Sequence, residues 1–236
     1  MQARSTRLFR RTIVVVGAAL VGLMLLPIAG ANANSVLFHQ DFQGLQAGSK
    51  WSDGTVHGSM KSVFDGYGSV GVVKSDSKVL QLKPRRSTSA SETHSSLVTS
   101  KSSFGDLDYR VRAKTVKQLR AGTPNPWETA WVVWHYRDNT HFYYLILKTN
   151  GWELGKENPN YPGAQRFLKT GSSPKFPVGH WNSVEVHQVG ASINITVDGK
   201  RLVHFVDHKH PYLHGAVGAY TEDAKVFYDN ISVAHA

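Results

Sequence analysis

Cysteine is absent from the sequence, which excludes disulfide bonds and thiolate-bound metals. Runs of lysine and arginine are also missing, and such runs are typical of nucleic-acid-binding arms. After residue 33 there is no amphipathic helical pattern of any length. We therefore expect a β-rich fold without disulfides, and we expect no nucleic-acid partner.

The first 33 residues have the three-part pattern of a secretory signal peptide. Arginines precede an apolar run at 13–28, and the small residues at 31–33 form a cleavage site. The apolar run is short for a membrane span, which needs about 20 residues. We expect cleavage after Ala33, a single domain at 34–236, and no membrane span after cleavage. The expected location is secreted, outside the cell or in its envelope. Export without disulfides favours a bacterial protein.

The charge of the chain is positive. The formal net charge is +10, and without the four leader arginines 23 basic and 17 acidic residues remain, which gives +6. A positive protein attracts polyanions. For an exported protein, an acidic polysaccharide or an anionic envelope fits this charge better than nucleic acid does.

Short segments of alternating hydrophobicity follow the leader, separated by turn residues. Asp198-Gly199 and Asn150-Gly151 each lie between two such segments, a pattern typical of tight β-hairpins. The pattern predicts an all-β fold, a two-sheet antiparallel β-sandwich of the jelly-roll type. The expected strands are 35–42, 69–73, 79–83, 95–99, 108–117, 129–136, 142–148, 151–156, 165–170, 181–189, 192–197, 200–207, 215–220 and 224–233.

Several longer segments together resemble the concanavalin A-like, laminin-G-like jelly-roll family. They are the opening strand 36–42, the paired middle segment 131–144, the Gly-His-Trp-Asn segment 179–186, the hairpin 194–200, and the closing segments 215–220 and 227–233. The resemblance covers nearly the whole chain after the leader and implies this fold. The family includes polysaccharide lyases, glycoside hydrolases, keto-disaccharide hydrolase-like domains and plain carbohydrate-binding modules, so the fold alone does not decide the activity.

The catalytic residues of the family are only partly recognisable. Retaining glycosidases of this fold carry Glu-x-Asp-x-x-Glu on one strand, and the motif is absent here. Glu153 and Glu157 would lie about 13 Å apart on a strand, beyond the roughly 5 to 9.5 Å of glycosidase pairs. Cross-strand carboxylates stay open. Lyases of the family use a histidine and a tyrosine, so the resemblance makes His94 the candidate base with Tyr143 or Tyr144 as acid. The alternative for His94 is an ordinary surface histidine.

Candidate substrate-binding residues are cationic or aromatic. Alternation along 108–117 places three cations on one sheet face, which either binds an anionic chain or is simply solvated. Trp127 precedes a strand that starts near Trp131, and sugars stack on such rings. Alternation places Trp131 and His135 on one face of that strand, and Trp134 and Tyr136 on the other. The full expected set is Arg110, Arg112, Lys114, Trp127, Glu128, Trp131, His135, Lys156 and Arg166.

The family resemblance also implies a structural calcium ion between the first and last strands. Asp41 and Asp229 occupy the corresponding positions and offer the hard oxygen ligands that calcium takes. The alternative is that both aspartates accept turn hydrogen bonds.

These observations predict a secreted, monomeric carbohydrate-binding protein that acts on an extracellular or cell-wall polysaccharide, with an acidic polysaccharide favoured by the charge. Two alternatives stay open. One is a polysaccharide lyase or glycoside hydrolase that uses the same groove, and the other is a noncatalytic envelope or adhesion protein.

Overall fold

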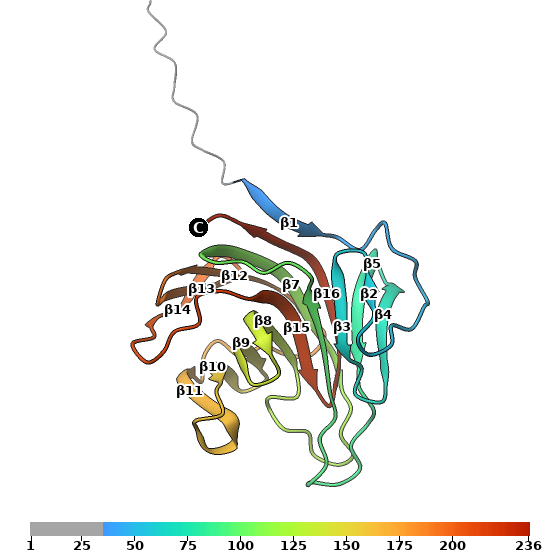
Figure 1. Cartoon of the computed structure of the whole chain (residues 1–236). Helices are drawn as coiled ribbons and strands as arrows, with labels where there is room; N and C mark the ends of the chain where they lie inside the picture. Colours follow the sequence, from blue (N-terminus) through green and yellow to red (C-terminus); the bar gives the residue numbers. More distant parts are fainter. Residues whose placement is uncertain (1–34) are drawn as a thin grey trace, which may run out of the picture. The chain divides into compact units, whose positions relative to one another are not determined.

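The computed structural model describes residues 35–236, which form a sandwich of two antiparallel sheets (Figure 1). The predicted signal peptide and its cleavage site lie outside these residues. Within the described range there is no helix with the length and apolar character of a membrane span.

Sheet A has eight strands. Its order is β14 (Lys200–Val206), β13 (Ser192–Val197), β12 (Trp181–Val189), β7 (Leu107–Gln118), β16 (Ala224–Ala234), β5 (Lys78–Lys83) and β4 (Ser69–Lys74), and β1 (Val36–Gln40) pairs with β16.

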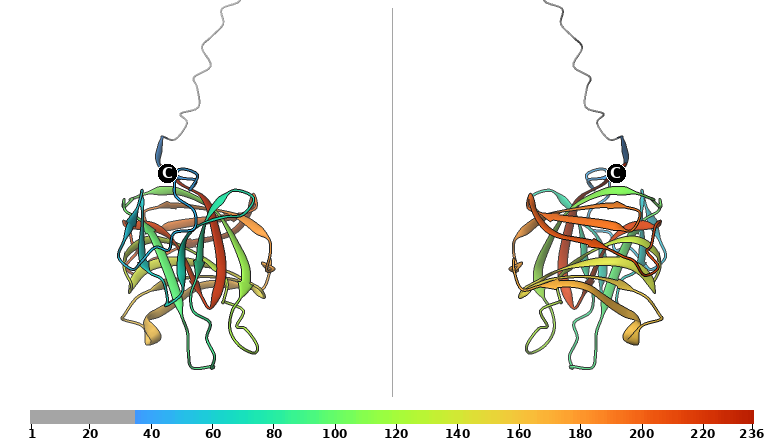
Figure 2. Two further views of the ribbon diagram at one scale, coloured as in Figure 1. Left: turned by 90° about the vertical axis from the view of Figure 1, so that its right-hand side faces the viewer. Right: turned by 90° about the vertical axis from the view of Figure 1, so that its left-hand side faces the viewer.

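Sheet B also has eight strands. Its order is β11 (Gln165–Gly171), β10 (Gly151–Glu157), β9 (His141–Lys148), β8 (Ala130–Asp138), β15 (Ala216–Glu222), β6 (Ser95–Ser100), β3 (Met60–Phe64) and β2 (Val56–His57). Strands β2–β5 lie together at one side of the unit, and the edge strands β11 and β14 lie at the other (Figures 1 and 2).

The all-β sandwich is confirmed, and each predicted strand has a counterpart with ends shifted by a few residues at most. Asp198 and Gly199 have φ angles of 51° and 72°, the left-handed pair that a tight hairpin between β13 and β14 requires. The β9–β10 turn differs by one residue from the prediction. Gly151 pairs with Lys148, so Thr149 and Asn150 form the turn.

Inward-facing side chains of both sheets form one apolar core. Several buried polar atoms between the sheets are paired, as is usual for polar groups in a protein interior. Trp134 donates to Gln188 at 2.7 Å. The hydroxyl of Tyr228 on β16 accepts from the backbone N–H of Trp131 at 3.0 Å and lies 2.7 Å from the carbonyl oxygen of Tyr220. Tyr228 therefore ties sheet A to β8 and β15 of sheet B.

A bulge in β8 overturns the predicted alternation at His135. This residue has a φ of 47°, and the pairing with β9 shifts register between Trp134 and Asp138. The His135 ring is fully buried, with its nitrogens 2.7 and 2.9 Å from two backbone carbonyl oxygens. The extra residue turns Tyr136 to the same side as Trp131, where it contacts Phe142. His135 therefore does not share the Trp131 face.

Candidate functional site

The outer face of sheet B is hollowed over β8, β9, β10, β11 and β15. We call this hollow the sheet B groove. Its volume is about 430 Å³. The lining residues are Trp127, Trp131, Ile146, Lys148, Glu153, Gln165, Phe167 and Glu222.

Aromatic rings form the floor and rim of the groove. The ring of Trp131 packs between Tyr144, at 5.0 Å between centroids, and Tyr220, at 4.9 Å. These rings belong to a second apolar cluster, separate from the core. At the rim, Trp127 is 40% exposed and Phe167 is 61% exposed. Exposed rings beside a fixed floor offer flat apolar surface to a ligand.

Three glutamates surround this floor from two strands. Glu153 on β10 accepts from the hydroxyl of Tyr144 at 3.2 Å and faces Lys148 at 3.3 Å. Glu222, the last residue of β15, accepts from the hydroxyl of Tyr220 at 2.8 Å. Glu157 ends β10 on the same face as Glu153, because residues two and four apart on a strand point the same way.

Burial and the negative charge of nearby carboxylates raise the pKa values of two of these groups. Burial, followed by the negative charge of Glu222, raises the pKa of Glu157 to about 7. Burial also raises the pKa of Glu222, and the charges of Asp223 and Glu128 add to the effect. Interacting carboxylates of this kind hold a proton near neutral pH, so the pair can supply one acid and one base.

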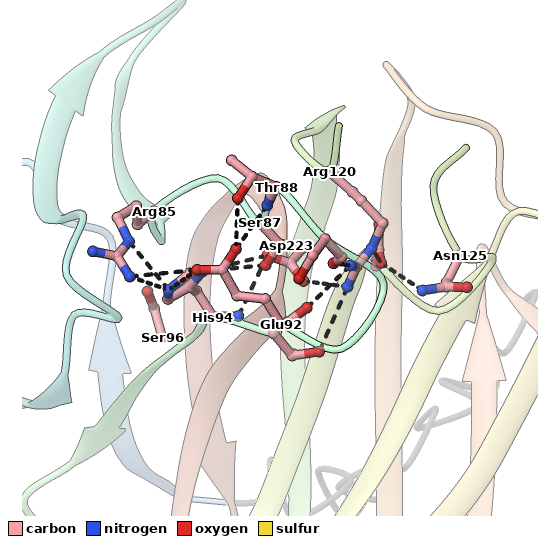
Figure 3. Close-up of polar contacts among 12 residues, drawn as sticks. Arg85, Ser87, Thr88, Glu92, His94, Ser96, Arg120, Asn125 and Asp223 are labelled. Carbon is pink, nitrogen blue, oxygen red and sulfur yellow. Dashed lines mark hydrogen bonds and ion pairs between the residues drawn. The ribbon is translucent and has the colours of Figure 1, made fainter. Parts of the chain in front are cut away.

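A buried polar network fixes the end of β15 next to Glu222 (Figure 3). Asp223 follows Glu222 and accepts hydrogen bonds from Ser87, at 2.5 Å, and from Arg120, at 2.7 Å. Arg120 also donates to Glu128 at 2.5 Å. Glu128 is fully buried, so it belongs to this network and does not line the groove as the sequence predicted.

His94 belongs to the same network (Figure 3). Its Nε2 atom faces the guanidinium of Arg85 at 2.8 Å and Glu92 at 3.2 Å, and its Nδ1 atom lies 3.1 Å from the hydroxyl of Ser87. The side chain is 6% exposed. Both ring nitrogens therefore contact groups of the same loop, which runs between β5 and β6 and contains His94 itself.

The predicted pairing of His94 with Tyr143 is wrong on geometric grounds. Tyr143 accepts from the backbone N–H of Tyr212, before β15 begins, whereas His94 contacts Asp223, after β15 ends. A strand of this length spans roughly 20 Å. Tyr144 lies on the opposite face of β9 from Tyr143, where its ring is fully buried and packs against Trp131, which lines the groove.

Tyr143, Lys156 and Arg166 converge on Asp207. The carboxylate of Asp207 accepts from Tyr143 at 2.7 Å, from Lys156 at 2.6 Å and from Arg166 at 3.2 Å. Burial lowers the pKa of Lys156 and raises the pKa of Tyr143. These contacts hold the segment after β14 against sheet B. Lys156 and Arg166 therefore do not line the groove, which corrects their predicted role.

The predicted cations of β7 lie on the other sheet. Register with β12 and β16 places Arg110, Arg112 and Lys114 on the outer face of sheet A. Their shared face is as predicted, but Trp127 and Trp131 lie on the outer face of sheet B. The predicted substrate-binding set is thus split between opposite sides of the sandwich.

The two predicted calcium ligands lie close enough to interact. Burial raises the pKa of Asp229, and the negative charge of Asp41 adds to the rise. Two carboxylates are few for an ion that takes six to eight oxygens. Residues 35–236 contain no group of three or more acidic or histidine side chains arranged to hold a metal. Calcium binding stays a prediction.

The sequence did not point to Glu222 or Tyr220. Both residues lie on the same face of β15, as the alternation along that strand predicts. Which face of β15 belongs to the groove depends on its pairing with β8, where Tyr220 is opposite Trp131. Spacing along one strand relates Glu157 only to Glu153, whereas its interaction with Glu222 arises from a separate strand.

The fold and the groove define a carbohydrate-binding or glycoside-hydrolase-like jelly roll. The family model described as "3-keto-alpha-glucoside-1,2-lyase-like domain" matches residues 36–234, and the chain belongs to this family. No curated protein matches the chain in sequence.

Solved structures support the fold. A carbohydrate-binding module, CBM66 from Bacillus subtilis, aligns with a TM-score of 0.54 at 13% identity, over 73% of this chain and 93% of that chain. A glycoside hydrolase family 16 endo-glucanase from Bacteroides ovatus aligns with a TM-score of 0.53 at 13% identity, over 84% and 99%. A protein of unknown function with a galectin-like fold, from Bacillus subtilis, aligns with a TM-score of 0.52 at 11% identity, over 85% of this chain and 96% of that chain.

Proposed function

We propose that this protein binds a carbohydrate in the sheet B groove and breaks a glycosidic bond there. The observation that carries the proposal is a pair of glutamates with raised pKa values, Glu157 and Glu222, beside an aromatic floor. The leader pattern supports export, so the proposed substrate is an extracellular glycan or a fragment of one.

The aromatic surface supports sugar binding. The apolar C–H faces of a pyranose ring stack on aromatic rings, and Trp127 and Phe167 offer such surface at the rim. Lys148, Glu153 and Gln165 supply hydrogen-bonding groups for hydroxyls at the same hollow. A few polar groups among apolar ones are typical of small-molecule sites.

The carboxylate pair supports the elimination that the family description indicates. In a 3-keto glucoside, the hydrogen on C2 is acidic because the neighbouring carbonyl stabilises the carbanion. The ionised glutamate takes this proton, the electron pair forms a C1–C2 double bond, and the C1–O bond breaks. The protonated glutamate then gives its proton to the leaving oxygen. Glu157, with a pKa of about 7, is suited to be the base.

The test is release of an aryl alcohol from an aryl 3-keto-α-glucoside by the purified protein. E157Q and E222Q are each expected to lower kcat/KM by about 10²- to 10⁴-fold, because each loses one proton transfer. E185Q changes an exposed glutamate on sheet A and serves as the matched control. Mass spectrometry separates the lyase from a hydrolase, since the eliminated product is lighter by one water.

Noncatalytic recognition is the second candidate, and the exposed rim rings favour it. Calorimetric binding of oligosaccharides without turnover, weakened by W127A, would establish recognition alone. Turnover that persists undiminished in both E157Q and E222Q would show that the assigned pair is wrong.

A further inference from the structure

The outer face of sheet A, opposite the groove, carries a concentration of positive charge. We call it the basic face, and it comprises Arg110, Arg112, Lys114, Lys117 and Lys225. These residues come from two neighbouring strands, β7 and β16. The proposed function makes no use of them.

Most of these cations lack an acidic partner. Arg110 pairs with Glu185 at 2.8 Å, and Arg112 lies 3.9 Å from Asp229. Lys114, Lys117 and Lys225 make no ion pair within the part of the chain that the structure describes (see Figure 1 for its extent). The basic face therefore keeps an excess of positive charge that its own acidic residues do not neutralise.

Two of the lysines lie directly opposite one another. Lys117 and Lys225 are register partners on adjacent antiparallel strands. Like charges at such positions repel and destabilise the sheet. An anionic ligand that contacts both side chains would remove this repulsion. The two lysines would therefore destabilise the sheet less when the ligand is bound.

Aromatic rings hold the cations in place. The guanidinium of Arg112 lies 4.8 Å from the centroid of Trp181, with the ammonium of Lys114 at 5.9 Å. Lys225 lies 5.1 Å from the ring of Phe227. These cation–π contacts limit the rotamers of long side chains before any ligand arrives. Binding then loses less conformational entropy.

Neutral hydrogen-bonding groups border the cations. A hollow of about 300 Å³ is lined by Arg110 and Arg112, by Glu185, which pairs with Arg110, and by the neutral groups of Ser183, Thr196, Asn230 and Ser232. Hydroxyl and amide groups suit sugar hydroxyls, and guanidinium groups suit carboxylates in bidentate fashion. The combination fits a ligand that is both hydroxylated and anionic.

We propose that the basic face is a second binding site, for an acidic polysaccharide, separate from the sheet B groove. The carboxylates of the polysaccharide pair with Arg112, Lys114, Lys117 and Lys225. The hydroxyls of the polysaccharide form hydrogen bonds in the hollow beside Arg110. The site retains the protein on a polyanionic glycan while the opposite face stays free. This proposal does not depend on the activity proposed for the groove.

The test measures affinity for polygalacturonate, with neutral dextran as the uncharged probe, by affinity electrophoresis of the full mature protein. K114Q/K225Q is expected to bind polygalacturonate about tenfold more weakly, as two solvent-exposed ion pairs are lost. Its affinity should also depend less on salt. K61Q/K169Q removes the same charge from exposed positions on sheet B strands and should bind as the wild type.

Circular dichroism checks that both double variants are folded, as expected for surface substitutions. If both double variants lost the same affinity for polygalacturonate, the loss would be due to net charge alone, and the proposal would be overturned. Unchanged binding by K114Q/K225Q would overturn it as well. Tighter binding of a short DNA duplex than of polygalacturonate, at the same ionic strength, would point to nucleic acid instead.

Discussion

The carboxyl group of Glu157 is partly buried beside aromatic rings, and its ionisation therefore affects the stability of the protein. Burial raises its pKa to about 7 from the ordinary value of 4.5. The folded state thus binds this proton more tightly than the unfolded state does. The resulting stability is fully present below pH 4.5 and is lost as the pH rises through 7.

We therefore predict that E157Q stabilises the protein at pH 8 and has little effect at pH 4. The amide removes the cost of an ionised, partly buried carboxylate. Allowing for partial exposure, the gain is about 1–2 kcal/mol, or about 3–6 °C in Tm for a chain of this length. Differential scanning calorimetry at both pH values measures it. The same Tm difference at pH 4 and pH 8 would show that the titration of Glu157 is not the cause.

The buried side chains of Lys156 and His94 differ from the groove glutamates because hydrogen bonds and ion pairs within the protein hold them in place. Lys156 contacts Asp207 and two backbone carbonyl oxygens, and His94 contacts Asp223 and side chains of its own loop between β5 and β6. Fully partnered polar groups in the interior fix one arrangement of the chain. Sequence patterns for lyases or for cationic grooves select the same residue types, so a structural role and a catalytic role look alike until the partners are known.

At the scale of elements, β9 and β10 form the groove floor through a close approach. Tyr144 on β9 is opposite Gly155 on β10, and a Cβ atom at Gly155 would lie 2.1 Å from the Tyr144 hydroxyl oxygen. No side chain other than hydrogen fits there without moving the ring. The glycine therefore determines where Tyr144 lies on the floor.

G155A is expected to displace the Tyr144 ring, with two effects. Overpacking should lower the free energy of unfolding by about 1–3 kcal/mol, measured in urea. Carbohydrate affinity in the groove should fall as well, measured by calorimetry. G44A is the matched control, because a Cβ atom there would meet no atom within 4 Å. Normal affinity in G155A would mean that the position of Tyr144, which packs against Trp131, does not determine the shape of the groove.

The alternation of polar and apolar residues predicted most strands well, because period-two burial is a local property. Strands β2 and β3 were missed, since Val56–His57 is only two residues long and β3 depends on pairing with β6. The β8 bulge was also missed. The backbone of His135 in the bulge packs closely against Gly215, where an added Cβ atom would lie 2.3 Å from it. A local sequence pattern cannot predict a contact between residues this far apart in the sequence.

On the scale of the whole molecule, the two outer faces of the sandwich differ in chemistry. One carries glutamates and aromatic rings, and the other carries two arginines and three lysines that make no ion pair with any of residues 35–236. The sequence predicted both types of residue but placed them in one groove. Which strands join which sheet depends on long-range pairing, so the separation of Trp131 from Arg112 could be seen only in the folded structure.

Since packed sheets are about 10 Å apart, groups on the two outer faces are too distant to share a small ligand. We therefore predict that substitutions on the two faces have additive effects on small ligands. K114Q/K225Q should turn over an aryl 3-keto-α-glucoside with unchanged kcat and KM. E157Q should bind polygalacturonate within about twofold of the wild type. The combined variant should show both defects with a coupling free energy below about 0.5 kcal/mol.

An acidic polymer long enough to reach both faces should behave differently. Attachment at the basic face raises the effective concentration of the same chain at the groove. K114Q/K225Q should then raise KM for an acidic polymeric substrate by about tenfold, while K61Q/K169Q leaves it unchanged. Steady-state kinetics on the polymer and on the aryl glucoside, side by side, measure the difference. An equal change in KM for both substrates would mean that the lysines act on the groove itself and not by retaining the polymer.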